Sequence, residues 1–287
     1  MNERRLTLAV PNKGRLVEPT LALLHDAGLV FEERDRSLVS PVDNVGLDIL
    51  FVRTNDVVEF VRDAVADLGI TGADLLAESE VDLPLVRSLG YGRCRLTAAV
   101  PRDAAQERAE DLAGLRIATS HPRATRRWFG DRGIPVEVIP LSGAVEVAPR
   151  LGLAEAIVDL VSTGATLASN GLRSIGDLLP SEAILVGNPA ALRARAEDVD
   201  RLSTMLGAVL EGRRRKYVMM NAPAERLGEL EALLPGLASP SVIPLAHAGM
   251  IAIHAVVGAD DVWALLPRLK SAGASGILVL PIEKLIA

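Results

Sequence analysis

The chain has 287 residues, of which 49% are hydrophobic and 3% aromatic, and its formal net charge is −6. The negative charge argues against bulk binding to nucleic acid, and no uninterrupted apolar stretch is long enough to span a bilayer. No apolar leader follows Met1, and Cys94 is the single cysteine. We therefore expect a soluble cytoplasmic protein without intrachain disulfides or a cysteine-based zinc site.

The first hundred residues alternate between strand and helix patterns. Apolar runs at residues 6–10, 47–52, 67–70 and 93–100 predict strands. Apolar residues at helical spacing follow each of the first three runs, and Gly28 ends the first helix. Strands that alternate with helices predict an α/β fold with largely parallel sheets.

A second unit, from about residue 101 to 180, follows the same logic. Its predicted strands are residues 116–119, 136–141 and 157–161, each followed by a polar turn. One more strand, at residues 183–186, is a candidate to return to the first unit. The two units together predict two α/β layers that face each other.

The rest of the chain contains a long helix and a separate small domain. The helix pattern runs from about residue 190 to 212, and the basic segment 213–216 follows it as a solvated junction. Beyond this junction, apolar runs and a helix capped by Asp260 give the order βαββαβ, which is typical of a ferredoxin-like domain. Such a domain appended to an α/β body is often regulatory.

The turns that follow the predicted strands are short, polar and rich in Gly, Ser or Thr. In open α/β sheets, ligands bind beyond the carboxyl ends of the strands, so two facing units would form a cleft lined by these turns. The preferences of helix starts explain the Ser, Thr, Asn and Asp residues. They explain Lys13, Arg15 and Arg53 poorly, because a positive charge at a helix start opposes the helix dipole. These cations therefore favour a polyanionic ligand.

The segment 157–166 is the most informative part of the chain. An apolar strand, interrupted by Asp159, runs into a Ser-Thr-Gly-Ala-Thr loop and then into a helix pattern at Leu167. This order points backbone N–H groups and hydroxyls at one place, where a phosphate is stabilised, and Gly164 allows a close approach of the backbone. Asp159 could hold a cation or a sugar hydroxyl. The alternative is an ordinary strand-to-helix turn with a Thr cap.

Five motifs in chain order resemble the long form of ATP phosphoribosyltransferase, which commits ATP and phosphoribosyl pyrophosphate to histidine synthesis. They are VPNKGRL (10–16), DLGITGAD (67–74), CRLTAAVP (94–101), GAVE (143–146) and GLAEAIVDLVSTGATL (152–167). Each motif is weak alone, but five in order are specific. The tail GASGILVLPIEK (273–284) resembles the histidine-sensing domain of the family, so the resemblance covers essentially the whole chain.

The resemblance implies a two-lobed α/β catalytic body, similar to a type II periplasmic binding protein, with the active site in its cleft. Lobe I would comprise residues 1–100 and about 181–212, and lobe II residues 101–180 with the phosphoribosyl pyrophosphate loop. A ferredoxin-like βαββαβ regulatory domain, residues 213–287, would bind histidine. The family also implies magnesium, a cytoplasmic hexamer in equilibrium with dimers, and feedback inhibition by histidine, without nucleic acid or membrane as partner.

The implied reaction is a pentosyl transfer. The adenine N1 of ATP attacks the anomeric carbon of phosphoribosyl pyrophosphate, and pyrophosphate leaves. No enzyme nucleophile is needed, so the protein works by positioning and electrostatic stabilisation. Two polyphosphates must share one cleft, and cations would offset their repulsion. The candidates are magnesium, held mainly through the substrate phosphates, and the side chains of Lys13, Arg15, Arg53 and Arg95.

The resemblance also implies which residues make each set of contacts. The catalytic candidates are Lys13, Arg15, Glu146 and Asp159. Phosphoribosyl pyrophosphate would contact Asp159, Ser162, Thr163, Gly164, Ala165 and Thr166. ATP would contact Lys13, Gly14, Arg15, Arg53, Asp74, Leu89, Gly90 and Arg95. Histidine would contact Asn221, Ser241 and Gly276. Asn221 stands where some relatives carry Asp, so the amine of bound histidine would lose a charge partner.

Several other residues have simpler interpretations. His121 lies in a turn of the predicted cleft, but we interpret it as a helix-start histidine. We interpret Cys94 as a small core residue. The basic cluster of Arg123, Arg126 and Arg127 is interpreted as a solvated helix face.

Two alternative functions remain open from the sequence. Prephenate dehydratase also joins a two-lobed body to a small regulatory domain, but its Thr-Arg-Phe signature is only partly matched by residues 125–127. A non-enzymatic module for small ligands, such as a transporter receptor or the effector half of a transcription regulator, is the other alternative. The lack of an export signal argues against the former, and the lack of an N-terminal helix-turn-helix argues against the latter.

Overall fold

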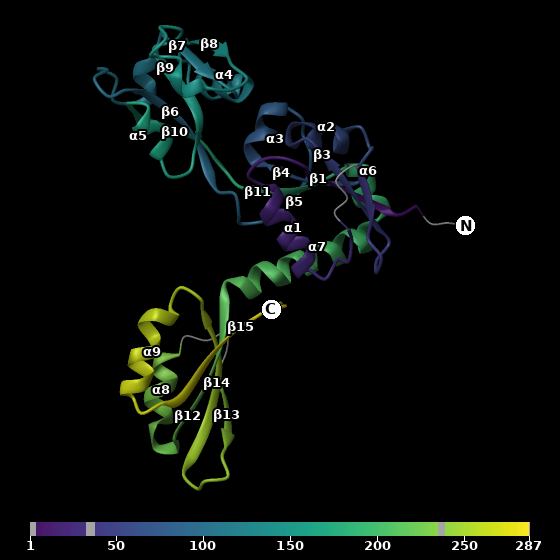
Figure 1. The fold of residues 1–287 in the computed structure, drawn as a ribbon, viewed down its shortest axis with the longest axis vertical. Helices are drawn as coiled ribbons and strands as arrows, with labels where there is room; N and C mark the ends of the chain where they lie inside the picture. Colours follow the sequence, from purple (N-terminus) through teal and green to yellow (C-terminus); the bar gives the residue numbers. More distant parts are fainter. Residues whose placement is uncertain (1–3, 33–37, 235–238, 287) are drawn as a thin grey trace. The chain divides into compact units, whose positions relative to one another are not determined.

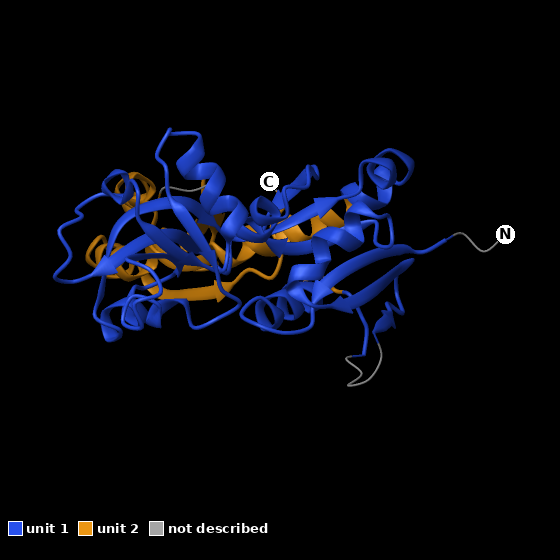
Figure 2. Ribbon diagram, turned by 90° about the horizontal axis from the view of Figure 1, so that it is seen from above, with its two compact units in different colours: residues 1–25, 29–200 blue, residues 26–28, 201–287 orange. Residues whose placement is uncertain are grey.

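The computed structural model describes residues 4–32, 38–234 and 239–286 of the chain (Figure 1). The chain forms two compact units, of which the first comprises residues up to 25 and 29–200 and the second residues 26–28 and 201 onwards (Figure 2). None of the helices in the described ranges combines the length and the apolar character that a membrane crossing requires.

The first unit contains two sheets, and we call the six-stranded sheet with its helices lobe I. Its strands are β1 (Leu6–Pro11), β2 (Val39–Pro41), β3 (Leu47–Val52), β4 (Leu68–Gly72), β5 (Leu85–Ser88) and β11 (Ala183–Gly187). Its helices are α1 (Val17–Asp26), the 3₁₀ turn η1 (Thr54–Asp56), α2 (Val57–Arg62), α3 (Ala73–Ser79) and α6 (Pro189–Ala194). The strand order is β2-β3-β1-β4-β11-β5. The core beneath α2 is aliphatic, with Val57 and Val61 packed against Ala9 and Val186.

The second sheet, with its helices, forms lobe II. Its strands are β6 (Cys94–Pro101), β7 (Arg116–Thr119), β8 (Glu137–Pro140), β9 (Ala156–Val161) and β10 (Leu172–Ser181), in the order β10-β6-β9-β7-β8. Its helices are η2 (Ala109–Leu112), α4 (Pro122–Gly130), η3 (Val145–Val147) and α5 (Ala165–Ser169). Phe129, Ile117 and Val158 are fully buried in its core.

The prediction of largely parallel sheets is wrong for both lobes. In lobe I, β3, β1 and β4 are parallel, but β2 pairs with β3 and β11 pairs with β4 and β5 in antiparallel fashion. In lobe II, β9, β7 and β8 are parallel, whereas β10, β6 and β9 are antiparallel. The physical reason is that helical crossovers, which parallel pairing requires, are missing where the chain passes between the lobes.

The chain passes twice between the lobes. It leaves lobe I after β5 and enters lobe II at β6, and it returns directly from β10 to β11. The expected return of residues 183–186 to the first unit is thereby confirmed, because β11 pairs with β4. Two mixed sheets joined by two such crossings form a two-lobed α/β body, as the resemblance implies.

Strand β10 was not predicted, and its burial pattern explains why. Leu172, Ile175, Leu178 and Ser181 are buried, so every third residue faces inward. Two register shifts against β6 produce this spacing, because each bulge adds a residue and turns the following side chain to the other face. The strict alternation that identifies a strand in a sequence is therefore absent.

The single helix predicted for residues 190–212 is divided into two. α6 ends at Ala194, Arg195 adopts φ −127° and ψ 32°, and α7 (Ala196–Arg213) follows. The Arg195 guanidinium lies 2.8 Å from Asp198 and donates to the carbonyl of Arg4 at 2.7 Å. These contacts hold the break, which neither glycine nor proline marks in the sequence.

The second unit confirms the predicted βαββαβ order. It contains β12 (Arg215–Pro223), η4 (Ala224–Arg226), α8 (Leu227–Leu233), β13 (Ser241–Pro244), β14 (Met250–Gly258), α9 (Val262–Ser271) and β15 (Ser275–Pro281). The antiparallel sheet has the order β13-β14-β12-β15, and α8 and α9 cover one face (Figure 1). Val218, Ile253 and Leu269 are fully buried between sheet and helices. α9 begins at Val262, so Asp261 occupies the N-cap position that was predicted for Asp260.

Candidate active site

A cavity of about 410 Å³ lies at the carboxyl ends of the lobe I strands and is lined by residues of both lobes. Lobe I contributes the turns after β1, β3 and β4, and lobe II contributes the turn after β7 and one residue of β9. The lining residues are Gly14, Arg15, Leu16, Thr54, Asn55, Glu59, Gly72, Asp74, Leu75, Glu78, Ser79, Ser120, His121, Arg123 and Leu160. The expectation of a cleft lined by post-strand turns is confirmed for these four turns.

Asp74, the second residue of α3, joins several segments around this cavity. Its side chain is 2% exposed, and Oδ1 accepts a hydrogen bond from Ser181 at the end of β10 and lies 3.4 Å from Arg15 Nη2. Oδ2 lies 3.2 Å from Nε2 of His121 in lobe II. A Cβ at Gly72 would collide with this carboxylate, so the turn between β4 and α3 requires glycine there.

Opposing effects set the pKa of the Asp74 carboxyl. Burial, the largest effect, raises the pKa, but the hydrogen bonds from His121 and Ser181 and the nearby charge of Arg15 together lower it by more. The pKa is therefore below its ordinary value. Asp74 thus supplies a buried negative charge to the cavity, whose lining also includes the carboxylates of Glu59 and Glu78 and the guanidinium groups of Arg15 and Arg123.

A second carboxylate of α3 meets the backbone of lobe II. Glu78 accepts hydrogen bonds from the N–H groups of Arg123, at 3.0 Å, and Ala124, at 2.9 Å, at the start of α4. The first N–H groups of a helix have no intrahelical partner and carry partial positive charge, so a carboxylate is stabilised there. Arg127 also donates to the carbonyl of Ala77 at 2.6 Å. These contacts fasten α3 of lobe I to α4 of lobe II.

The predicted cations of lobe I differ in their placement. Arg15 lines the cavity together with Gly14, and its guanidinium donates to the carbonyl of Gly92. Lys13 and Arg53 are exposed and are not among the residues that line it. The Lys13 carbonyl accepts a hydrogen bond from Thr54 at 2.9 Å, which ties the turn after β1 to the turn after β3. Arg15 is thus the cation that the structure brings to Asp74.

Asp159 lies on β9, next to the cavity-lining Leu160, and is half-buried. Its Oδ1 accepts a hydrogen bond of 2.8 Å from the Leu160 N–H. Burial is the main cause that raises the pKa of Asp159, and the negative charge of Glu146 raises it further, against the lowering effects of the Leu160 N–H and of His121. Glu146, on η3, is also half-buried. Two neighbouring carboxylates of this kind can accept hydroxyl groups or metal-bound waters.

The loop of residues 162–166 connects β9 to α5, so the predicted order of strand, glycine turn and helix start is confirmed. Gly164 has φ +80°, in the left-handed region that favours glycine. Thr163 Oγ1 accepts a weak hydrogen bond of 3.5 Å from the N–H of Ala165. Ser162, Thr163 and Thr166 are exposed, so their hydroxyls are open to solvent. This loop does not line the 410 Å³ cavity that contains Arg15 and Asp74.

The remaining predicted nucleotide contacts lie around the crossing from lobe I to lobe II. Leu89 is fully buried, and Gly90 has φ +72°. Arg95 is exposed, pairs with Asp177 of β10 at 3.0 Å and lines another cavity, of about 600 Å³, with Cys94. Burial is the main cause that raises the pKa of the Cys94 thiol, as expected of a core cysteine. The structure does not bring these three predicted residues to the cavity of Arg15 and Asp74.

The predicted histidine contacts all lie in the second unit. Asn221 and Ser241 are exposed on the sheet face opposite the helices, because Met220 and Ile253, which alternate with them in register, belong to the core beneath the helices. Gly276 adjoins Asn221, since a Cβ on Gly276 would lie 3.6 Å from the Asn221 amide nitrogen. Asn221 and Gly276 are therefore neighbours, and Ser241 lies two strands away, beyond β14.

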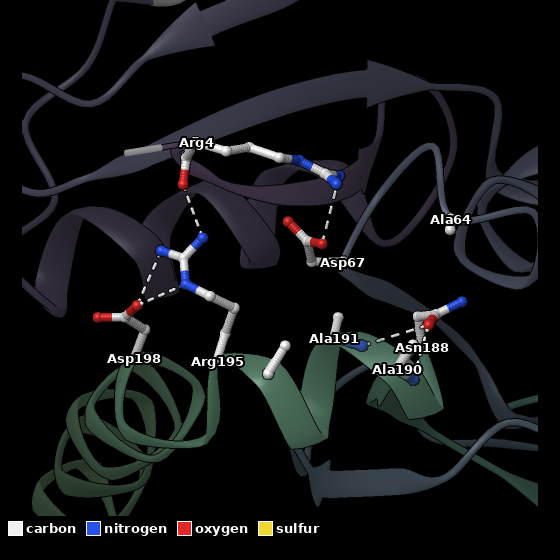
Figure 3. Close-up of a pocket in the computed structure, with 9 residues that line it drawn as sticks. Arg4, Ala64, Asp67, Asn188, Ala190, Ala191, Arg195 and Asp198 are labelled. Atoms are coloured by element: carbon white, nitrogen blue, oxygen red, sulfur yellow. Dashed lines mark hydrogen bonds and ion pairs between the residues drawn. The ribbon is translucent and has the colours of Figure 1, made fainter. Parts of the chain in front are cut away.

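Another cavity, of about 570 Å³, lies at the opposite end of the lobe I strands, beside the starts of β1 and β4 (Figure 3). Its charged side chains pair with one another, Arg4 with Asp67 at 3.4 Å and Arg195 with Asp198 at 2.8 Å. Alanines supply much of the remaining lining. None of the predicted site residues lines this cavity, and its charges are already compensated.

The described residues contain no group of three His, Cys, Asp or Glu side chains that could hold a metal ion by themselves. In lobe II, the carboxylates of Asp159 and Glu146 lie near enough for the charge of Glu146 to act on Asp159. Hard oxygen ligands of this type suit Mg²⁺ when substrate phosphates and waters supply the other ligands.

Among the residues at or beside the cavity that were not predicted as site residues, His121, Glu78 and Ser181 make the contacts described above. His121 was interpreted as a helix-start histidine, and it does precede α4, but its ring is buried against Asp74. No local sequence pattern indicates the role of Glu78, because its partner Ala124 lies 46 residues away in sequence. Ser181 closes the unpredicted strand β10. The basic cluster is exposed as predicted, although Arg127 also reaches lobe I.

Comparison with known proteins identifies similar chains over nearly the full length. The profile of the ATP phosphoribosyltransferase family (HisG) matches residues 53–208, and the profile of the HisG C-terminal domain matches residues 212–284. An ATP phosphoribosyltransferase of Gemmatimonas aurantiaca is 45% identical over 98% of this chain and 99% of its own. One from Methanococcoides burtonii is 40% identical, again over 98% and 99%.

Solved structures agree with the sequence comparison. The structure of an ATP phosphoribosyl transferase (HisG:HisZ) complex from Thermotoga maritima matches with a TM-score of 0.63 and 33% identity. The match covers 72% of this chain and 98% of that one.

Proposed function

Because the chain belongs to the ATP phosphoribosyltransferase family, we propose that ATP and phosphoribosyl pyrophosphate react in the cleft between its two lobes. The protein is a pentosyltransferase of histidine biosynthesis. It transfers the 5-phosphoribosyl group to N1 of the adenine of ATP and releases pyrophosphate, which is the first step of the pathway. Family membership overrides the alternatives of prephenate dehydratase and of a non-enzymatic ligand-binding module.

One observation carries the placement of the reaction. Turns at the carboxyl ends of the strands of both lobes meet at one cavity, which Arg15 and Asp74 of lobe I share with His121 of lobe II. Ligands of open α/β sheets bind at such edges. Two other cavities with charged linings lie at the opposite end of the lobe I strands and around Arg95, away from this meeting point.

The chemistry requires positioning more than covalent participation. The N1 lone pair of adenine attacks C1′ of the ribosyl group while the C1′–O bond to pyrophosphate breaks, and positive charge develops on the sugar. Holding both reactants in line can lower the barrier by about 7–11 kcal/mol. Carboxylates beside the sugar stabilise the developing positive charge, and cations compensate the phosphates.

On the ATP side, Arg15 is the residue with the firmest geometric support, because it lines the cavity and is held by Asp74 and the Gly92 carbonyl. We propose that Arg15 and Lys13 face the polyphosphate and that Asp74 accepts hydrogen bonds from the nucleoside. The other proposed ATP contacts are Gly14, Arg53, Leu89, Gly90 and Arg95.

On the ribosyl side, we propose that the exposed loop after β9 holds the 5′-phosphate. Ser162, Thr163, Gly164, Ala165 and Thr166 offer hydroxyls and backbone N–H groups there. Asp159 is proposed to accept a ribose hydroxyl, and Glu146 to act beside it. The raised pKa of Asp159 supports this role, because burial of a carboxylate without a charged partner is costly and is retained where function needs it.

Magnesium is proposed as the metal cofactor. When bound to the pyrophosphate of the donor, Mg²⁺ neutralises charge on the leaving group. The substrate phosphates would hold the ion, and Glu146, beside Asp159, would hold its waters.

The second unit is proposed to regulate the reaction. Residues 213–287 would bind histidine at Asn221, Ser241 and Gly276 and lower the activity of the catalytic body. We also propose a cytoplasmic homo-oligomer that interconverts between dimer and hexamer.

A direct assay tests the function. The full-length protein is mixed with ATP, phosphoribosyl pyrophosphate, Mg²⁺ and pyrophosphatase, and the absorbance of phosphoribosyl-ATP is followed. We expect product only when both substrates are present. No product from folded protein would contradict the assignment of the reaction to this chain.

A further inference from the structure

The buried histidine at the lobe junction has a geometry that a helix-start residue does not need. The chain has four histidines, of which His25 and His247 are exposed and His254 is half-buried. His121 is 5% exposed and lines the cavity. Both ring nitrogens have partners, Asp74 in the other lobe and Ser120 in its own.

The partners define which nitrogen carries a proton. A carboxylate only accepts hydrogen bonds, so Nε2 must donate to Asp74 Oδ2, 3.2 Å away. Nδ1 lies 3.0 Å from the hydroxyl of Ser120, which can either donate to the neutral ring or accept from the charged ring. The bond to Asp74 is therefore kept in both protonation states of the imidazole. The ring is a stable link whose orientation Ser120 holds.

The hydrogen bond between His121 and Asp74 is part of a larger contact between α3 and α4. Asp74 and Glu78 are four residues apart on α3, so both carboxylates point from one face of that helix. That face meets the start of α4, where Asp74 pairs with His121 and Glu78 accepts from the N–H groups of Arg123 and Ala124. The two carboxylates therefore fix both the rotation and the position of α3 against lobe II.

His121 also contacts the second oxygen of the Asp74 carboxylate. Oδ1 of Asp74 is engaged by Ser181 and Arg15. Oδ2 lies within hydrogen-bond distance of His121 Nε2, its partner among the described residues. A carboxylate oxygen has two acceptor positions, so Oδ2 retains one for a ligand donor once the imidazole has fixed its direction.

We propose that His121 is a positioning residue for ATP. It orients the Asp74 carboxylate toward the nucleotide and, through the contact of α3 with α4, keeps lobe II at the distance at which the nucleotide is held. This inference rests on the proposed function, because it takes the cavity around Asp74 as the ATP site. His121 acts through Asp74 and not on the reacting atoms.

The test compares three single variants in the full-length protein. His121→Ala removes the link, His121→Gln retains an N–H donor near the place of Nε2, and His247→Ala is a control on an exposed histidine of the second unit. ATP binding is measured by calorimetry without the ribosyl donor, and KM for each substrate and kcat are measured by the phosphoribosyl-ATP assay. Thermal unfolding of each variant is recorded alongside.

For His121→Ala we expect the Kd and the KM for ATP to rise roughly tenfold, as for loss of a hydrogen bond to a charged group. The KM for phosphoribosyl pyrophosphate should change by less than about twofold, since the ribosyl loop is in another part of lobe II. His121→Gln should recover most of the ATP affinity, and His247→Ala should match the wild type. In an Asp74→Asn background, the effect of His121→Ala should largely disappear, because the imidazole acts through that carboxylate.

Equal rises of both KM values, or an unchanged Kd for ATP in His121→Ala, would overturn the proposal. So would a His121→Ala effect that is fully retained in the Asp74→Asn background. If His121→Ala does not fold, His121→Leu, which fills the space but donates no hydrogen bond, and its double variant with Asp74→Asn carry the same comparison. Failure of the wild type to bind ATP at all would contradict the proposed ATP site itself, and is thus distinguishable from failure of the positioning role.

Discussion

The carboxylate of Glu78 in lobe I accepts a hydrogen bond of 2.9 Å from the backbone N–H of Ala124 in lobe II. A side chain of one lobe thus caps a helix of the other, where His121 at the N-cap position makes no side-chain cap bond. Besides the two chain crossings, a polar contact between α3 and α4 therefore joins the two lobes beside the catalytic cleft. This relationship leads to the first prediction.

Replacing Glu78 with Ala should lower the free energy of unfolding by about 1 kcal/mol, which is typical of the loss of a helix cap with its charge. Urea unfolding of the full-length protein measures this. Glu78→Gln should fall between Ala and wild type, because an amide oxygen still accepts but carries no charge. Asp82→Ala, which removes an exposed carboxylate four residues further on, is the matched control. Equal stability of the Glu78→Ala and Asp82→Ala variants would refute the capping role.

The Asp159→Asn variant should become more stable and less active. Burial raises the pKa of Asp159, so the folded protein favours the protonated form, and the ionised form destabilises the fold as pH rises through that pKa. Asn keeps the acceptor for the Leu160 N–H but cannot ionise. The stability gain over wild type should be present at neutral pH and shrink as the pH falls below the pKa of wild-type Asp159.

The same variant tests the catalytic role. We expect kcat/KM for the ribosyl donor to fall roughly tenfold or more, as for the loss of a charged acceptor. Urea midpoints at several pH values and steady-state rates measure the two effects. A variant that is less stable than wild type at neutral pH, or fully active, would disagree with this account of Asp159.

The ion pair of Arg116 and Glu155 should show the opposite dependence on pH. Their side chains approach to 2.5 Å, and the hydrogen bond from Arg116 lowers the pKa of Glu155 to about 2. The stability that this carboxylate contributes is present above its ordinary pKa and is lost as the pH falls toward 2. Because both side chains are about 40% exposed, Glu155→Gln should cost at most about 1 kcal/mol at pH 7. If Glu155→Gln lowered the free energy of unfolding more at pH 3 than at pH 7, the result would contradict this prediction.

Feedback by histidine should be strengthened by Asn221→Asp. The proposed site places Asn221 next to Gly276 on the exposed face of the second unit, and Asp would add a charge partner for the histidine amine. The concentration of histidine that halves the activity should fall by roughly threefold to tenfold, as for one exposed ion pair of about 1 kcal/mol or slightly more. Activity without histidine should not change. Equal sensitivity of the variant and the wild type to histidine would argue against a site at Asn221.

Local patterns in the sequence predicted most of the architecture. β3 and β7 were located to the residue, because their apolar runs are continuous and flanked by polar turns. The βαββαβ order of the second unit followed from the same periodicity. Strand β10 was not predicted, because two bulges give its buried residues a spacing of three. The helix break at Arg195 was not predicted either, because contacts of Arg195 with Arg4 and Asp198 stabilise it.

The site was predictable only in part, for a related reason. Polar turns after strands indicated where ligands gather, and Arg15 and Asp74 do share a cavity. The partners of these residues are set by the approach of two lobes. Asp74 meets Ser181 at a separation of 107 residues and His121 at 47, distances over which no local pattern carries information.

The most direct measurement is the pair of KM values, for ATP and for the ribosyl donor, in one variant of each lobe. Thr163→Ala with Thr166→Ala changes the loop of lobe II, Arg15→Ala changes lobe I, and Ser169→Ala at the end of α5 is the control. The proposed division of substrates predicts that the loop variant raises KM for the ribosyl donor by about tenfold or more and leaves KM for ATP within about twofold. Arg15→Ala should do the reverse. An unchanged KM for the ribosyl donor in the folded loop variant would contradict the central claim that the loop after β9 holds the ribosyl donor.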